Sequence, residues 1–249
     1  MKNSFSIIIP ARDEESYIGK CLKSIKKIKY SGKLEVIVVN NGSTDRTAKV
    51  AENLGAQVFR EDRLGVSYAR NLGAKKAKYD YLFFLDADCM LTKDYFSNLD
   101  KMMEIYGKQD VYAGPYVLYD GGWLIRYITD RLNYYYWYFR LIKLITNAQC
   151  FAGGNFVIRR DVFNKTGDFD TSIDNVLKAE DLEYALRLNR LGYKVYFRKD
   201  LRVLSSFRRI KRSPIRTMLV RLYYSIKLIY EHKCMQSKSH RNIQSNFRI

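Results

Sequence analysis

Two aspartates, Asp86 and Asp88, follow the most apolar run of the chain, residues 81–85. If that run is a buried strand, residues i and i+2 at its end point to the same side, so the two carboxylates lie close together. Neighbouring carboxylates repel each other unless a cation or water separates them. Mg²⁺ and Mn²⁺ bind such carboxylates together with phosphate oxygens, so the pair indicates a metal-diphosphate site. Taken by itself, Asp-x-Asp favours the alternative, a solvated turn.

A second pair of acids, Glu180 and Asp181, begins a segment with helical spacing. A positioned carboxylate can take the proton of an attacking hydroxyl group, as a general base does. Acids in the first turn of a helix are also favoured by the helix dipole. By spacing alone, this structural interpretation is the favoured one.

The segments that would position these acids alternate between strands and helices. Apolar runs predict strands at 5–9, 35–39, 56–59, 81–85 and 110–112. Helical patterns lie between them, including a helix from Asp45 to Leu54 that Thr44 caps and Gly55 ends. Such alternation predicts an α/β fold with a mostly parallel sheet flanked by helices, whose ligands bind beyond the carboxyl ends of the strands. We expect three loops at that edge, 10–15, 40–45 and 86–90.

The second half is richer in aromatic residues. Residues 123–146 look helical, and their five charged side chains argue against a membrane span. A strand and a short helix follow around Gly153 and Gly154, and then comes a helix that Gly192 ends before a further strand. Pro214 begins a long helix with an apolar face.

The basic charge is concentrated in the tail. The net charge is +18, and residues 205–249 contribute eleven Lys or Arg against the single acid Glu231, which is +10. This tail suits an anionic surface. We predict an amphipathic helix in the headgroup region of an anionic membrane, with residues 123–139 as a second interfacial element. Packing of the helix against the rest of the chain is the alternative.

Other classes of protein are less well supported. The basic charge permits nucleic-acid binding, but it lies in the tail and no nucleic-acid module is readable, so nucleic acid is an unlikely partner. Four scattered cysteines without a CxxC motif argue against a zinc site or a disulfide framework. The first apolar run is too short for a signal peptide and acids follow it at once, so we expect a cytoplasmic location.

Five segments, in order, resemble the family 2 inverting glycosyltransferases, which have the GT-A fold: IIIPARDEESYIGKCLKSI, EVIVVNNGSTDRTAKVAE, GVSYARNLGAKKAKYDYLFFLDADC, GGNFVIRRDVF and AEDLEYALRL. The resemblance covers about residues 4–204. It implies a Rossmann-like GT-A domain at 1–204, with a nucleotide-sugar-binding half at 1–112 and an acceptor-binding half at 113–204. Residues 205–249 would form the basic helical extension.

The resemblance also implies a donor site. Its residues would be Pro10, Ala11, Arg12, Glu14, Asn40, Asn41, Gly42, Ser43, Gly65, Arg70, Asp86 and Ala87. The family usually has an Asp in the second loop that accepts a hydrogen bond from the base. Here Asn40 and Asn41 stand in that loop, and an Asn carbonyl can still accept. A UDP-sugar is the favoured donor. Arg70 would reach a phosphate or the ribose, or would only pair with Asp86.

The remaining roles follow in the same way. Asp88 would be the direct ligand of Mg²⁺ or Mn²⁺, with Asp86 near the ribose and the metal. Asp181 would be the general base, in an acceptor site with Glu180, Gly153, Gly154 and Asn155. Arg208 and Arg209 would stabilise the leaving diphosphate, or would be simple solvated charge.

Two features differ from the family pattern. Gly167-Asp168-Phe169-Asp170 replaces the common Gly-Gly-Phe-Asp, and the Gln-x-x-Arg-Trp motif of processive synthases is missing. We therefore expect one sugar per encounter, passed to a saccharide or a lipid-linked saccharide at the inner face of a membrane. A sugar-nucleotide pyrophosphorylase is an alternative, but its glycine-rich loop after the first strand is not present at residues 10–13.

Overall fold

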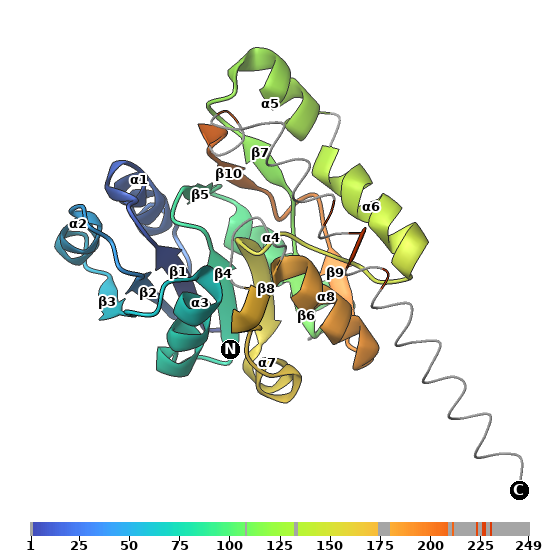
Figure 1. The fold of residues 1–249 in the computed structure, drawn as a ribbon. Coiled ribbons are helices and arrows are strands. Elements are labelled where there is room, and N and C mark those ends of the chain that lie inside the picture. The colour runs from blue at the N-terminus through green and yellow to red at the C-terminus, as the bar shows by residue number, and fades with distance from the viewer. Residues whose placement is uncertain are drawn as a thin grey trace, which may run out of the picture.

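A computed structural model of the chain describes residues 2–107, 109–131, 134–173 and 180–208, together with 211, 223, 226, 227 and 230. A large sheet of seven strands forms its centre (Figure 1). In spatial order these strands are β3 (Gln57–Arg60), β2 (Leu34–Asn40), β1 (Phe5–Ala11), β4 (Tyr81–Leu85), β8 (Asn155–Arg159), β6 (Val111–Ala113) and β9 (Val195–Phe197). A small sheet contains β5 (Cys89–Leu91), β10 (Val203–Ser205) and β7 (Tyr116–Leu118).

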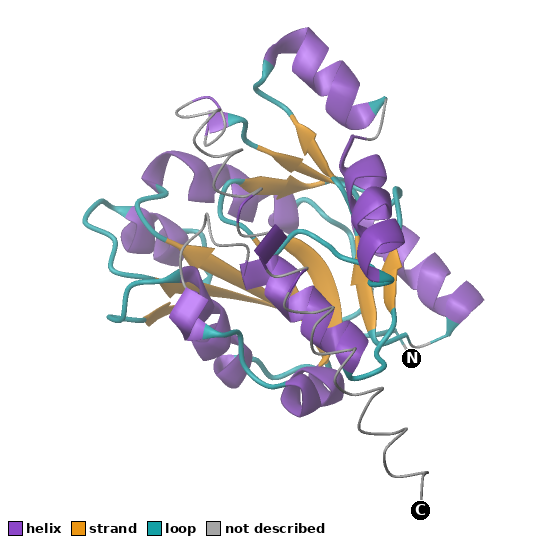
Figure 2. Ribbon diagram, turned by 45° about the vertical axis from the view of Figure 1, so that its right-hand side comes forward, coloured by secondary structure: helices purple, strands orange, loops and turns teal. Residues whose placement is uncertain are grey.

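Helices cover both faces of the large sheet (Figure 2). One face packs against α1 (Glu15–Lys26), α2 (Thr47–Asn53) and α4 (Tyr95–Tyr106). The other packs against α3 (Val66–Lys76), α6 (Tyr134–Thr146), α7 (Arg160–Thr166) and α8 (Glu180–Arg190). Alternate strand residues feed the two cores, as with Phe83 and Phe84 of β4. Both faces of the central strands β1, β4 and β8 are therefore buried, which explains their continuous apolar runs.

The prediction of a mostly parallel sheet flanked by helices is confirmed. β1, β2, β3 and β4 pair in parallel, and β6 pairs in parallel with β9. The five predicted strands are present, with ends shifted by one or two residues. The sequence did not predict that β8 runs antiparallel between β4 and β6. This strand joins the two predicted halves into one sheet.

The predicted start of the second helix was wrong. The helix α2 begins at Thr47 rather than at Asp45. Asp45 instead accepts a hydrogen bond of 2.9 Å from the backbone N–H of Thr47, while Thr44 donates to Asp13 of the preceding loop. Gly55 follows the end of the helix with φ 73°, as expected for a glycine in the left-handed region.

The aromatic segment forms two helices rather than one, α5 (Gly122–Asp130) and α6. Both lie at the outer edge of the molecule in Figure 1, beside β7 and β9. Within the described part of the chain, no helix combines the length and the apolar character that a bilayer span requires. The predicted helix from Pro214 lies almost wholly outside the described residues, so the basic extension stays a prediction.

Candidate active site

The loops that follow β1, β2 and β4 meet at one edge of the sheet, since these strands run parallel. The amino end of the antiparallel strand β8 reaches the same edge, where Asn155 pairs with Leu85. This edge therefore gathers most of the predicted site residues. They comprise Pro10 and Ala11 at the end of β1, Arg12 and Glu14 after it, Asn40 at the end of β2, Asn41, Gly42 and Ser43 after it, Asp86, Ala87 and Asp88 after β4, and Gly153 and Gly154 before β8.

The first two loops are tied to each other by side-chain hydrogen bonds. The Asp13 carboxylate accepts from the backbone N–H of Thr44 at 2.8 Å, and the Asp13 N–H donates to the Ser43 hydroxyl at 3.1 Å. The Glu14 N–H donates to the hydroxyl of Thr47 at 2.8 Å. The side chain of Arg12 beside them is exposed.

The two asparagines of the second loop differ in their surroundings. Asn41 is buried, and its amide donates to the carbonyls of Glu61 and Arg63 at 3.2 and 2.7 Å. Its carbonyl accepts from the N–H of Gly65 at 2.8 Å, so Asn41 holds the start of α3 against the end of β2. Asn40 is half-buried, and its side-chain carbonyl accepts a hydrogen bond from the Ser43 N–H at 3.1 Å.

Arg70 connects the two acidic centres. Its guanidinium is buried, and it contacts Asp86 at 3.3 Å and Glu180 at 2.9 Å. It also lies 5.4 Å from the ring centroid of Phe169. Burial alone would lower the pKa of Arg70, but the carboxylates of Glu180 and Asp86 raise it. A single permanent cation thus holds the loop after β4 against the start of α8.

Gly153 and Gly154 lie directly against this ion-pair network. A Cβ atom on Gly153 would lie 2.7 Å from Nη2 of Arg70, and one on Gly154 would lie 2.3 Å from Oδ2 of Asp86. Both distances are shorter than the contact that two atoms tolerate. The buried ion pair therefore leaves room only for glycine at positions 153 and 154, whether or not a sugar also approaches these residues.

Asp181 is buried, and backbone groups orient its carboxylate. The N–H of Gly153 donates to Oδ2 at 3.0 Å, and the N–H of Leu182 donates to Oδ1 at 2.9 Å.

The neighbouring Glu180 has a raised pKa. Burial, and then the negative charge of Asp181, raise the pKa of the Glu180 carboxyl to about 7, although Arg70 acts in the opposite direction. The excess of negative charge near Arg70 therefore favours a proton on Glu180.

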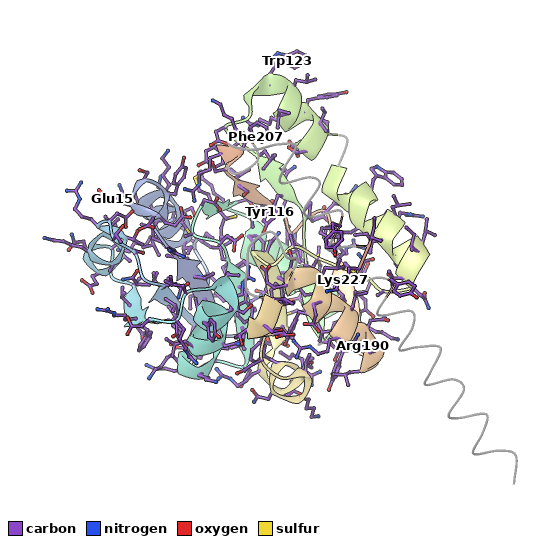
Figure 3. The ribbon with its side chains drawn as sticks, viewed as in Figure 1. Glu15, Tyr116, Trp123, Arg190, Phe207 and Lys227 are labelled. Carbon is purple, nitrogen blue, oxygen red and sulfur yellow. The ribbon has the colours of Figure 1, made fainter. Side chains whose placement is uncertain are left out.

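Tyr116 is a site residue that the sequence did not reveal. Its hydroxyl donates to Oδ2 of Asp86 at 3.4 Å and accepts from the N–H of Gly154 at 2.9 Å. Burial raises the pKa of this hydroxyl, and the charge of Asp86 adds to the effect, so it stays a donor. Tyr116 is labelled near the centre of the molecule in Figure 3. It follows no recognisable motif, and β7, where it lies, was not predicted.

Asn71 and Asn155, which lie in the segments that resemble the family, make hydrogen bonds that hold other parts of the fold in place. Asn71 exchanges two hydrogen bonds of 2.9 Å with the backbone of Phe169, which fixes the loop at 167–170. Asn155 is fully buried, donates to Pro115 and Leu201, and accepts from Tyr95. A contact between Asn155 and an acceptor stays a prediction.

The end of β10 brings Arg208 to the site. β10 pairs with β5, so that Ser205 lies opposite Cys89, the residue after Asp88. The Arg208 guanidinium contacts the Glu14 carboxylate, lies 3.5 Å from Oδ2 of Asp88, and stacks on the Tyr17 ring at 4.1 Å. Arg209 lies outside the described residues.

The acids after β4 suit a divalent metal. Asp88 is buried, and a cationic group, Arg208, already lies beside its carboxylate. Among the residues that the structure describes, no three acidic, His or Cys side chains form a cluster able to hold a metal. Mg²⁺ commonly binds one or two carboxylates together with substrate phosphates, so a metal held by Asp86 and Asp88 stays a prediction.

Comparison with known proteins identifies the family. The family model described as "Glycosyl transferase family 2" matches residues 6–167 of the chain. The chain is similar to 4,4'-diaponeurosporenoate glycosyltransferase of Staphylococcus haemolyticus, with 38% identity over 113 residues, which are 43% of this chain and 29% of the relative. It is also similar to Glycosyltransferase AglE of Haloferax volcanii, with 26% identity over 203 residues, 79% of this chain and 64% of the relative. The chain thus spans less than two thirds of either relative.

Solved structures support the GT-A fold. S. aureus TarS 1-349 in complex with UDP-GlcNAc aligns with a TM-score of 0.59 and 19% identity, covering 82% of this chain and 58% of that one. The mannosyltransferase PcManGT from Pyrobaculum calidifontis, in complex with GDP-Man and Mn²⁺, aligns with a TM-score of 0.64 and 16% identity. That alignment covers 96% of this chain and 76% of PcManGT. At these identities the likeness establishes the fold alone.

Replacing Gly154 by Ala tests the packing of the ion-pair network. The added methyl group would displace Asp86 from Arg70 and Tyr116, so we expect a loss of about 1–3 kcal/mol in the free energy of unfolding, measured with urea. Gly19→Ala is the matched control, because a Cβ there meets only the side chains of Val50 and Leu54, at 3.7 and 3.9 Å. Equal stability of the two variants would contradict the close contact between Gly154 and Asp86.

Replacing Glu180 by Gln should change how stability depends on pH. The folded protein keeps the Glu180 proton up to a pKa of about 7, whereas the unfolded chain releases it near the ordinary value of 4.5. The proton on Glu180 therefore contributes to the free energy of unfolding below pH 4.5. This contribution, about 1–3 kcal/mol, is lost as the pH rises towards 7. Urea unfolding across this range should show the loss in the wild type and not in Glu180→Gln. The variant Glu52→Gln, at an exposed glutamate of α2, should follow the wild type. Parallel curves for the wild type and Glu180→Gln would refute the assignment.

Proposed function

Since the chain belongs to glycosyl transferase family 2, we propose that it moves a sugar, with inversion, from a nucleotide-diphosphate donor to a saccharide or lipid-linked saccharide. The observation that carries the proposal is the placement of Arg70. Its ion pairs hold the acids after β4, assigned to the donor, next to Glu180 and Asp181, assigned to the acceptor. Direct displacement at an anomeric carbon needs both centres within reach of the same sugar.

The donor would bind along the loops that follow β1 and β2. Asn40 is better placed than Asn41 to meet the nucleobase, because the amide of Asn41 already holds the loop after β3. A UDP-sugar is our favoured donor. The two structural neighbours are complexes with UDP-GlcNAc and with GDP-Man, so both nucleotides belong in a test.

The diphosphate would lie beside Asp86 and Asp88. These two carboxylates would hold Mg²⁺ or Mn²⁺, with Asp88 as the direct ligand. Such an ion neutralises charge on the departing diphosphate. Arg208 would add charge-assisted hydrogen bonds to the same group, since its guanidinium is already within 3.5 Å of Asp88. Arg209 keeps the same predicted role.

Asp181 would take the proton of the acceptor hydroxyl. Its two backbone hydrogen bonds fix the orientation of the carboxylate. Glu180 would shape the acceptor pocket with Gly153 and Gly154. The predicted division into donor and acceptor halves at residue 112 follows from these roles.

The location of the enzyme belongs to the same proposal. A lipid-linked acceptor would place the protein at the inner face of a membrane, where the basic tail at 205–249 would contact anionic lipid. That tail contributes +10 of the net charge of +18.

Asp88→Ala should abolish metal-dependent binding of the donor nucleotide, because it removes the proposed metal ligand. The measurement is calorimetric titration with UDP and with GDP, each in Mn²⁺ and in EDTA. Asp80→Ala is the control, since Asp80 is an exposed acid that precedes the same strand at the opposite edge of the sheet. Binding that is retained in Asp88→Ala and still depends on Mn²⁺ would rule out Asp88 as the ligand.

Asp181→Asn should keep nucleotide binding within about twofold and reduce sugar transfer at least about a hundredfold, as expected for loss of a general base. Transfer is measured as release of the nucleoside diphosphate in the presence of acceptor. Asp161→Asn is the control, because Asp161 also lies in the first turn of a helix, α7, which follows the end of β8 opposite to Gly153 and Gly154. Undiminished transfer in Asp181→Asn would leave this acid only its structural role at the helix start.

A further inference from the structure

The outward side of α5 and α6 is an exposed apolar face. It consists of Trp123, Leu124, Tyr127, Trp137, Leu141, Leu144 and Ile145, with exposed fractions from 46% to 80%. These are half of the fourteen large apolar side chains that are exposed among the described residues. Both tryptophans of the chain belong to this face. Contiguous exposed apolar side chains on a folded protein indicate a surface that another body covers.

The opposite sides of the two helices account for how they are held. Phe139 and Ile142 of α6 are buried in the main core, and Phe139 packs on Phe197 of β9 with ring centroids 5.3 Å apart. Thr129 of α5 is buried and accepts a hydrogen bond from the N–H of Leu118 in β7. The exposed face is therefore not needed to fix α5 and α6 on the sheets.

The charges around the face are positive. Four exposed cations lie on or beside the two helices, at Arg126, Arg131, Arg140 and Lys143. The single acid in residues 122–146 is Asp130, and Arg202 pairs with it at 2.7 Å. The guanidinium of Arg140 lies 5.6 Å from the ring centroid of Trp137. Exposed Trp and Leu side chains bordered by cations are typical of helices that lie in the interface of an anionic bilayer.

The face also lies on the acceptor side of the molecule. In Figure 1, α5 lies at the top beyond the small sheet and α6 lies at the right beside β9, and Figure 3 labels Trp123 at the tip of α5, pointing away from the molecule. The chain runs from the end of α6 at Thr146 to Gly153, whose N–H binds Asp181. A segment of six residues thus joins the end of α6 to Gly153 of the proposed acceptor site.

We infer that α5 and α6 dock on an anionic phospholipid surface, with Trp123, Trp137 and Leu144 in the headgroup region and the cations facing the lipid phosphates. The docking is independent of the basic tail. It rests on the proposed function only for its purpose, which is to bring a lipid-linked acceptor to Asp181. Docking needs no donor, metal or transfer, so each proposal can fail without the other.

Tryptophan emission of the full chain tests this inference, because both tryptophans lie on the face. Titration with phosphatidylglycerol vesicles should shift the emission to shorter wavelength, and brominated lipid should quench it. Phosphatidylcholine vesicles should give a weaker response, and high salt should reduce the response to phosphatidylglycerol. The double variant Leu144→Ser, Lys143→Gln should lower the partition coefficient about tenfold or more.

The matched control is Ile105→Ser, Lys101→Gln. Ile105 is 71% exposed on α4, and Lys101, one turn before it, is exposed as well. This variant should bind vesicles as the wild type does. Vesicle binding without a change in tryptophan emission would assign the binding to the tail and overturn the inference. So would the absence of binding, or a lipid-free, concentration-dependent dimer in which the tryptophans become buried.

Discussion

The arrangement of the site depends on one buried cation. Arg70 lies between Asp86 and Glu180, away from solvent, and an unpaired buried guanidinium or carboxylate would cost several kcal/mol. Each partner therefore requires the others to be in place. Because the three side chains come from α3, the loop after β4 and the start of α8, the interaction fixes three distant parts of the chain relative to one another. This mutual dependence favours a single geometry for the donor and acceptor centres.

Several neighbouring features follow from this cation. Gly153 and Gly154 are small because Arg70 and Asp86 fill the space where their Cβ atoms would be. Tyr116 reaches Asp86 from β7, which pairs with β10, and β10 pairs in turn with β5, the strand that follows Asp88. The same surroundings act on Glu180, because burial and then the charge of Asp181 raise the pKa of its carboxyl to about 7. The environment of a carboxyl, and not its residue type alone, thus sets its chemistry.

The sequence alone was sufficient to predict the parallel part of the sheet and the position of three loops at one edge of it. Continuous apolar runs and the order of the segments determine both. It could not show that Arg70 pairs with Glu180 as well as Asp86, because 110 residues separate Arg70 from Glu180 and pairing at that distance depends on tertiary packing. It missed Tyr116, since a three-residue strand has too little periodicity to be read. It placed the cap of α2 at Thr44, because several polar residues of one loop compete for the same N–H groups and only the folded loop decides among them.

The antiparallel strand β8 has a consequence for the order in which the protein folds. It lies between β4 and β6, yet it follows both of them in the chain. During synthesis, the edge of β4 that faces β8 and both edges of β6 emerge before their partner strands β8 and β9. Unpaired strand edges are templates for aggregation, and β4 consists of large apolar and aromatic side chains. β6 can join the sheet only after residues 155–159 have arrived, so the first half cannot complete its own sheet without a strand of the second half.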